Sequence, residues 1–147
     1  MSPNDEVFDN PTGWISQHIR QYVESRGAKG HRYYGRPALL LTTRGRRSGK
    51  LRRTALYYGE DEGRYILVGS DGGAPRDPAW CLNVVANPAV VVQIRDETFA
   101  ALARLAGPDE RPPLWELMTA IFPKYAAYQR KAGREIPVVI VERVRPG

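Results

Sequence analysis

A dense group of cations is the segment of this sequence best suited to bind a charged ligand. Residues 44–53 run RGRRSGKLRR and contain no acidic side chain. The chain carries a net charge of +6, and without the cations of this segment its basic and acidic residues are equal in number. Guanidinium groups bind phosphate and carboxylate in bidentate geometry, and neighbouring glycine and hydroxyl groups suit phosphate binding. The segment therefore predicts a site for a polyanionic ligand, with a solvated turn as the alternative.

Paired glycines and a helix start form a second segment with binding potential, at residues 70–79. Gly72 and Gly73 permit positive φ and allow the backbone to approach a flat ring closely. The pair Asp77-Pro78 predicts an N-cap followed by the first helical residue. The unpaired N–H groups of that helix start would favour an anionic or electron-rich part of a ligand.

Aromatic residues at helical spacing complete the set. Trp80 and Asn83 lie one turn apart, so they can act on the same ligand. Tyr125 and Tyr128 share a helical face and could line a pocket for an aromatic substrate, with simple packing as the alternative. Together with the basic segment, these residues indicate a ligand that has a polyanionic tail and a flat polar ring system.

Several familiar motifs are not met. Residues 45–51 differ from a P-loop because three residues, not four, separate the glycines and because Leu51 replaces the hydroxyl residue that holds magnesium. Neither G-x-G-x-x-G nor G-x-S-x-G occurs. With His18, His31 and the single Cys81, no Cys/His metal site is expected. His18 and Cys81 are expected in the core, with catalytic and reactive roles as the alternatives.

Hydrophobic periodicity predicts a mainly β chain. Strands are expected at 38–43, 53–58, 65–69, 89–94, 98–105 and 137–144, and helices at 12–27, 78–86, about 112–122 and 124–131. Thr12 is expected to cap the first helix and Gly27 to end it, while 59–64 and 71–78 are expected to be irregular. Consecutive strands without helical crossovers favour an antiparallel barrel with rim helices over a doubly wound parallel sheet. We expect one domain over residues 12–147 after a flexible N-terminus at 1–11.

Three blocks of the sequence resemble a known family. They are ALLLTTRGRRSGKLRRTALYY, YILVGSDGGAPRDPAWCLNVVANPAVVVQI and YAAYQRKAGREIPVVIVERV. In order and spacing they are similar to the deazaflavin-dependent nitroreductases of actinobacteria, whose members are also described as coenzyme F420-dependent quinone reductases. The resemblance spans Pro37 to Val144. It implies a split β-barrel of the FMN-binding, pyridoxamine-phosphate-oxidase type, in which reduced F420 passes a hydride to a quinone, nitroaromatic or other conjugated acceptor.

The resemblance also implies roles for particular residues. The coenzyme's phosphate and glutamate tail would be held by Arg46, Arg47, Ser48, Gly49, Lys50, Arg52 and Thr54. The deazaflavin ring would be bordered by Ser70, Asp71, Gly72, Gly73, Pro78, Ala79, Trp80 and Asn83. The catalytic residues facing the acceptor would be Ser70, Tyr57, Tyr125 and Tyr128, with Tyr125 or solvent as the proton donor. Relatives carry a lysine at the position of Asp71 and a tyrosine at that of Phe122.

Alternatives to this interpretation remain. The fold would also suit an FMN-binding reductase, a basic nucleic-acid-binding barrel or a carrier without turnover. Nucleic acid is not expected as a partner, because the charge outside residues 44–53 is balanced. A single cysteine and the lack of a leader-like or membrane-spanning segment predict a cytoplasmic protein. The apolar stripe of the first helix could touch a membrane surface, and a homodimer is the expected assembly.

Overall fold

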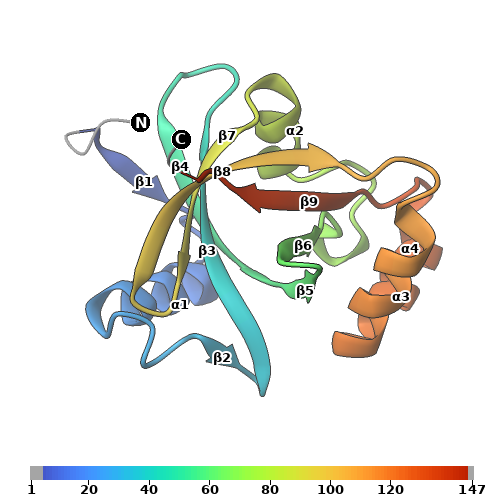
Figure 1. Ribbon diagram of the computed structural model, residues 1–147, viewed down its shortest axis with the longest axis horizontal. Helices are drawn as coiled ribbons and strands as arrows, with labels where there is room; N and C mark the ends of the chain where they lie inside the picture. The colour runs from blue at the N-terminus through green and yellow to red at the C-terminus, as the bar shows by residue number, and fades with distance from the viewer. Residues whose placement is uncertain (1–4, 146–147) are drawn as a thin grey trace.

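One strongly curled sheet dominates the computed structural model, which describes residues 5–145 (Figure 1). The strands are β1 (Val7–Asp9), β2 (Arg32–Tyr33), β3 (Arg36–Arg44), β4 (Leu51–Tyr57), β5 (Gly59–Asp61), β6 (Arg64–Val68), β7 (Ala89–Ile94), β8 (Glu97–Leu105) and β9 (Val138–Arg143). The helices are α1 (Gly13–Glu24), the 3₁₀ turn η1 (Asp71–Gly73), α2 (Ala79–Ala86), α3 (Arg111–Ile121) and α4 (Lys124–Ala132).

The sheet is a barrel that stays open on one side. Its order is β1-β4-β3-β7-β8-β9-β6-β5, with β2 attached to β3. All pairs are antiparallel except β1 with β4. No hydrogen-bonded ladder joins β4 to β6 within residues 5–145, so the split lies there. The expectation of a mainly β fold with rim helices is confirmed, and the sheet is not closed.

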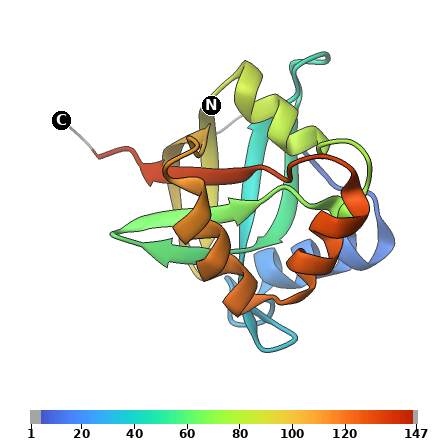
Figure 2. The ribbon, with the colours of Figure 1, turned by 90° about the vertical axis from the view of Figure 1, so that its right-hand side faces the viewer.

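Helices cover the outer face of the sheet on two sides, which explains the apolar runs in the sequence. On β9, Val139 and Val141 face the barrel core, whereas Val138 and Ile140 pack with Met118 of α3. Figure 2 shows α3 and α4 lying beside these strands. Strands buried on both faces lose the polar alternation of a half-exposed sheet. The run at β3 has the same cause, because α1 covers its outer side.

The first helix begins as expected, with Thr12 at the N-cap position, but it ends at Glu24, before Gly27. Gly27 has a φ of 79°, and a Cβ at this position would lie 2.2 Å from the Cα of Arg95, so only glycine fits. The side chain of Thr12 makes no capping hydrogen bond, so the prediction is confirmed for the position only. Asn10 Oδ1 accepts the Thr12 N–H at 3.0 Å, a bond that lies just before the helix. His18 lies in the core, where its Nε2 contacts the carbonyl oxygen of Gly30 at 2.7 Å.

Most other elements lie where the sequence predicts them, although short strands such as β2 were not expected. The break at Pro123 is confirmed, because α3 ends at Ile121 and α4 begins at Lys124. The expected irregular segments contain β5 and η1. Within the expected flexible segment 1–11, β1 pairs with β4, while residues 1–4 and 146–147 of the two expected ranges lie outside the described part of the chain. In the described residues, no helix has the length and apolar character needed to cross a membrane.

Candidate cofactor-binding site

A cleft of about 490 Å³ gathers most of the predicted cofactor-binding residues. It lies between the N-terminal segment, the turn after β3, strand β4 and the start of α2. The predicted residues that line it are Arg46, Arg47, Ser48, Arg52, Thr54, Asp71, Pro78, Ala79, Trp80 and Asn83. Two of the three segments selected from the sequence, the basic turn and residues 71–83, therefore meet at one surface, whereas the third, with Tyr125 and Tyr128, lies outside this cleft.

The basic turn between β3 and β4 has a defined backbone. The N–H of Gly45 donates to the carbonyl of Lys50 at 2.7 Å, and the N–H of Gly49 donates to the carbonyl of Gly45 at 2.8 Å. Gly49 has a φ of 72°, a conformation that glycine adopts without strain. Ser48 Oγ accepts the Lys50 N–H at 3.1 Å. Hydrogen bonds within the turn thus fix its backbone. The positions from which its cationic side chains extend are therefore defined.

Asn83 connects this turn to α2. Its side chain is 3% exposed. Its Nδ2 donates to Thr43 Oγ1 at 3.0 Å, and its Oδ1 accepts the backbone N–H of Arg46 at 3.1 Å. The amide of Asn83 is therefore occupied by protein groups, and its main effect on the cleft is to hold the turn against the helix.

The cleft is rich in cations that have no carboxylate partner. Among the ion pairs of residues 5–145, none involves Arg46, Arg47 or Arg52. Arg53, which also lines the cleft, is neutralised by Asp9 through contacts of 2.6 and 3.1 Å. Unpaired guanidinium groups around a concave surface favour an anionic ligand.

The start of α2 adds to the positive potential of the cleft. The N–H groups of Cys81 and Leu82 both donate to the carbonyl of Pro78, which leaves those of the preceding helical residues without a helical acceptor. Asp77 was predicted to cap this helix, and that prediction was wrong. Its carboxylate oxygen Oδ1 instead accepts a hydrogen bond from the Arg134 guanidinium at 2.5 Å.

Arg134 organises the loop between β6 and α2, and the sequence contained no signal for it. Its side chain is 14% exposed and donates to the carbonyls of Gly69, Ser70 and Ala74 at 3.3, 3.1 and 2.9 Å. These bonds fix residues 69–77 against α4. Ser70 itself is buried, and its hydroxyl makes no hydrogen bond to the described protein groups.

The two glycines of η1 take up left-handed conformations, with φ values of 64° at Gly72 and 83° at Gly73. They were predicted to let the backbone approach a flat ring. At Gly73 the close approach is to protein instead, because a Cβ there would lie 3.0 Å from the carbonyl oxygen of Tyr128. Gly73 thus joins η1 to α4.

Four aromatic rings form a cluster beside this joint. Phe122 is its centre, with ring centroids 5.1 Å from Tyr57, 4.9 Å from Tyr125 and 6.1 Å from Tyr128. Burial raises the pKa of the Tyr125 phenol, and burial also raises that of Tyr57, where Arg36 acts in the opposite direction. Both phenols therefore stay protonated at neutral pH and can donate hydrogen bonds.

Not every predicted residue lines the cleft. Those outside its lining are Gly49, Lys50, Ser70, Gly72, Gly73, Tyr57, Tyr125 and Tyr128. Asp71 lies in the lining and begins η1, whose last residue touches α4, so the cleft and the aromatic cluster share one wall.

The N-terminal segment was missed. Phe8, Asn10 and Pro11 line the cleft, and the ring of Phe8 lies under the Lys50 and Arg52 cations at 5.1 and 5.4 Å. Nothing in so short and polar a segment predicts a strand, because its pairing with β4 depends on a partner that is distant in sequence.

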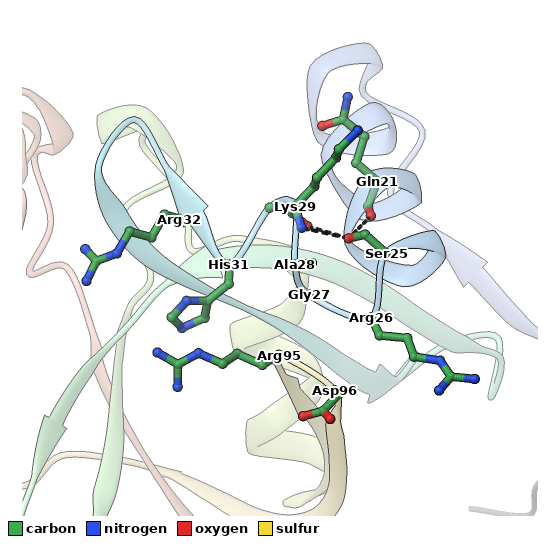
Figure 3. A pocket seen from close by; sticks show the side chains of 11 residues that line it. Gln21, Ser25, Arg26, Gly27, Ala28, Lys29, His31, Arg32, Arg95 and Asp96 are labelled. Carbon is green, nitrogen blue, oxygen red and sulfur yellow. Dashed lines mark hydrogen bonds between the residues drawn. The ribbon is translucent and has the colours of Figure 1, made fainter.

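A second hollow, of about 950 Å³, lies between the end of α1 and the β7–β8 turn (Figure 3). Cations surround it, but the side chains of Arg26 and Arg32 point in opposite directions. His31 lies within it, bonded through Nε2 to the Tyr58 hydroxyl at 2.9 Å. None of the predicted cofactor-binding or catalytic residues lines this second hollow.

Neither the Cys81 thiol nor the arrangement of possible metal ligands indicates a reactive site in the described residues. Cys81 is a buried thiol, as expected, and burial raises its pKa, which disfavours the reactive thiolate. Across residues 5–145, no group of three His, Cys, Asp or Glu side chains is placed to hold a metal ion.

Comparisons with known structures define the class of fold. A solved structure from Listeria innocua that carries a pyridoxamine 5′-phosphate oxidase name matches with a TM-score of 0.53 at 14% identity, over 74% of this chain and 84% of its own. At this identity the likeness concerns the fold alone. The protein is thus a split barrel of the pyridoxamine-oxidase type, left open between β4 and β6.

Closer relatives then define the family. The profile of the F420H(2)-dependent quinone reductases matches residues 14–143. An F420H(2)-dependent quinone reductase of Mycobacterium tuberculosis is 33% identical over 143 residues, which cover 88% of this chain and 96% of the relative. The chain belongs to this family. It is an F420H2-dependent reductase whose cofactor is reduced coenzyme F420.

Two solved structures are also similar to this chain over most of its length. An F420-H2 dependent reductase, FDR-A, is 45% identical with a TM-score of 0.67, over 73% of this chain and 95% of its own. A structure described as a domain-swapped dimer is 39% identical with a TM-score of 0.70, over 90% of this chain and all of its own.

The residues present fit the coenzyme. Unpaired guanidinium groups in the cleft match an acidic tail, and the indole of Trp80 with the N–H groups at the start of α2 matches a polar ring.

Proposed function

We propose that this protein transfers a hydride from reduced F420 to a quinone, nitroaromatic or other conjugated acceptor, with the coenzyme seated in the cleft described above. The observation that carries the proposal is the set of unpaired cations from the turn at residues 45–50, opposite Trp80 and the start of α2. When bound, reduced F420 supplies a hydride.

The residues divide into two groups by what they can do. Arg46, Arg47 and Arg52 hold the acidic tail through charge-assisted hydrogen bonds, helped by the hydroxyls of Ser48 and Thr54. The aromatic cluster around Phe122 faces the acceptor, together with the Ser70 hydroxyl, which has no hydrogen-bond partner among the described protein groups. Its apolar rings exclude water and present a flat surface, while its phenols remain available as hydrogen-bond donors.

A charge-reversal experiment tests the coenzyme site. We expect Arg47→Glu with Arg52→Glu to weaken binding of oxidised F420, followed by its fluorescence, at least about 100-fold, because each lost charged contact costs about 1.5–3 kcal/mol. The matched control is Arg26→Glu with Arg32→Glu, which changes the net charge equally but lies at the second hollow. Equal losses in both variants would contradict a specific site.

Turnover is tested separately, by oxidation of reduced F420 with menadione, an enone and a nitroaromatic. We expect oxidation with at least the quinone. Tight F420 binding without oxidation by any of the three would instead support a carrier. A yellow purified protein with a flavin spectrum and no F420 affinity would support FMN as the ligand, and salt-sensitive RNA binding without F420 affinity would support a nucleic-acid function.

Assembly and location also belong to the proposal. One relative is described as a domain-swapped dimer, which supports a homodimer here, and light scattering after gel filtration measures it. The single buried cysteine supports a cytoplasmic protein. Trp14 on α1 is 59% exposed, which supports a peripheral membrane contact through this helix.

A further inference from the structure

Arg36 lies at the aromatic cluster and was not among the residues selected from the sequence. We propose that Arg36 positions the Tyr57 hydroxyl to donate a hydrogen bond to the oxygen of the hydride acceptor. This inference rests on the proposed function and names a positioning residue for the same site.

The guanidinium of Arg36 is fixed at three points. Its Nε donates to the carbonyl of Ile121, the last residue of α3, at 2.8 Å. Its Nη1 donates to the carbonyl of Tyr34 at 3.3 Å. Its central carbon lies 5.0 Å from the ring centroid of Phe122, a cation–π distance. Because both ends of the group are engaged, its position relative to the cluster is defined by the fold.

This position allows the group to act on Tyr57. Arg36 and Tyr57 both lie against the Phe122 ring, at 5.0 and 5.1 Å from its centroid, and Arg36 acts against the rise in the pKa of Tyr57 that burial causes. A guanidinium has only donors, so towards Arg36 the Tyr57 oxygen can only accept, and the phenolic proton remains free for another acceptor. The other titratable groups that act on Tyr57 are Tyr33 and Tyr34, and both raise its pKa.

Tyr125 is less suited to the same task. It is 5% exposed and is enclosed by the rings of Phe122, Trp115 and Tyr128. Burial is the main cause of the raised pKa of Tyr125, and the opposing effect of Arg36 is smaller than the effects of Tyr57 and Tyr128. Tyr57 is half-buried, so part of this residue remains accessible to a ligand.

The chemistry of the acceptor explains why such a donor is useful. Hydride addition to a conjugated carbonyl or nitro group places negative charge on an oxygen of the acceptor. A phenol polarised by a guanidinium stabilises this charge as it develops. Two electrons and one hydrogen reach the acceptor as hydride, and the proton that completes the reduction comes from solvent, so Tyr57 is unchanged after the reaction.

The first test compares four variants with menadione and reduced F420. Arg36→Met is expected to lower kcat/KM about tenfold and Tyr57→Phe by at least as much, with smaller losses for Arg36→Lys and for Tyr125→Phe. The affinity for oxidised F420 is expected to stay within about twofold of wild type. In the Tyr57→Phe background, Arg36→Met should add little, because the two side chains act as one unit.

The second test does not depend on turnover. With tyrosine labelled at Cζ, the Tyr57 carbon resonance, assigned from the Tyr57→Phe variant, reports the ionisation of this phenol. Arg36→Met is expected to raise the pKa of Tyr57. An unchanged pKa, or a full tenfold loss from Arg36→Met on top of Tyr57→Phe, would overturn the inference. Should Arg36→Met melt too early to assay, the same comparison with Arg36→Lys decides, since it keeps the charge but loses the fixed geometry.

Failure of this inference is distinguishable from failure of the proposed function. If the wild-type protein does not bind F420, the proposed function fails. If it binds F420 and reduces menadione but the Arg36 variants behave as wild type, only the role of Arg36 is overturned.

Discussion

Asn83 illustrates how a buried side chain can support a binding site although its polar atoms bond to protein groups and not to a ligand. Sequence spacing placed it beside Trp80 on one helical face, and both residues do line the cleft. Its amide, however, bonds to Thr43 and to the backbone of Arg46, so it joins a strand, a helix and the basic turn. The cations of the turn are thereby positioned before any ligand arrives.

We expect Asn83→Ala to lower the free energy of unfolding by about 1–3 kcal/mol, because it leaves buried partners of the amide unsatisfied. F420 affinity should fall as well, since the turn loses its anchor. Urea denaturation and fluorescence titration measure the two effects. Gln17→Ala, an exposed amide on α1, is the matched control, and an equal loss of stability there would contradict this explanation.

Glu110, at the start of α3, contributes to the stability of the fold in a pH-dependent way. Arg104 and the N–H of Gly107 bond its carboxylate at 2.7, 2.8 and 2.9 Å and lower the pKa of Glu110 to about 2 from an ordinary 4.5. A lowered carboxyl pKa stabilises the fold fully above about pH 4.5, and the contribution is lost as the pH falls towards 2.

Glu110→Gln should therefore be less stable than wild type at pH 7, and the difference should shrink between about pH 4.5 and 2. Urea unfolding at pH 7, 4 and 3 measures this change. Glu116→Gln, also on α3, serves as the control. A difference that stays constant with pH would mean that the ionised carboxylate is not responsible.

The contact between η1 and α4 shows how two elements share a wall of the site. Gly73 lies against the backbone of Tyr128, and Arg134 holds the neighbouring carbonyls from the other end of α4. The loop that borders the cleft is therefore fixed to the helix that carries the aromatic cluster. Neither contact has a local sequence signature, because each joins residues more than 50 positions apart.

Gly73→Ala should destabilise the protein by more than Gly72→Ala. Both residues have positive φ, which costs alanine about 1 kcal/mol or more, but only at Gly73 does a Cβ also lie 3.0 Å from a backbone oxygen of α4. Thermal unfolding of the two variants compares them directly. Equal destabilisation would show that the packing against α4 is not tight.

Across the molecule, positive charge is concentrated rather than spread. The net charge of +6 equals the summed charge of the segment 44–53 alone. Only part of this charge is neutralised locally, by Asp9 on Arg53 and by Asp5 near Arg44 at 3.7 Å. The cleft is therefore expected to attract an anionic coenzyme over distances comparable with the Debye length.

F420 affinity should accordingly fall as salt is raised from 50 to 500 mM, whereas the melting temperature of the free protein should change little. Fluorescence titration at several salt concentrations tests this. The Arg47→Glu, Arg52→Glu variant should show a weaker dependence on salt. Affinity that is independent of salt would indicate that the ring, and not the tail, dominates binding.

Much of the fold was accessible from local patterns. The helices around residues 13–24 and 111–132, the break at Pro123 and the hairpin at 89–105 all follow from hydrophobic periodicity and proline geometry, which act over a few residues. The basic turn and the glycine pair were equally visible, because their composition is unusual. The aromatic pair at positions 125 and 128 was visible from its spacing.

Other features depended on which distant segments meet. A three-residue strand such as β1 has too few residues to be recognised, and its pairing with β4 exists only once the barrel has formed. The partners of Asp77, Asn83 and Arg36 lie between 37 and 85 positions away. Composition and periodicity determine elements and candidate ligands because they are local properties. The tertiary structure alone decides which candidate side chains face the cleft and which are used to hold it, since that depends on contacts between residues far apart in the chain.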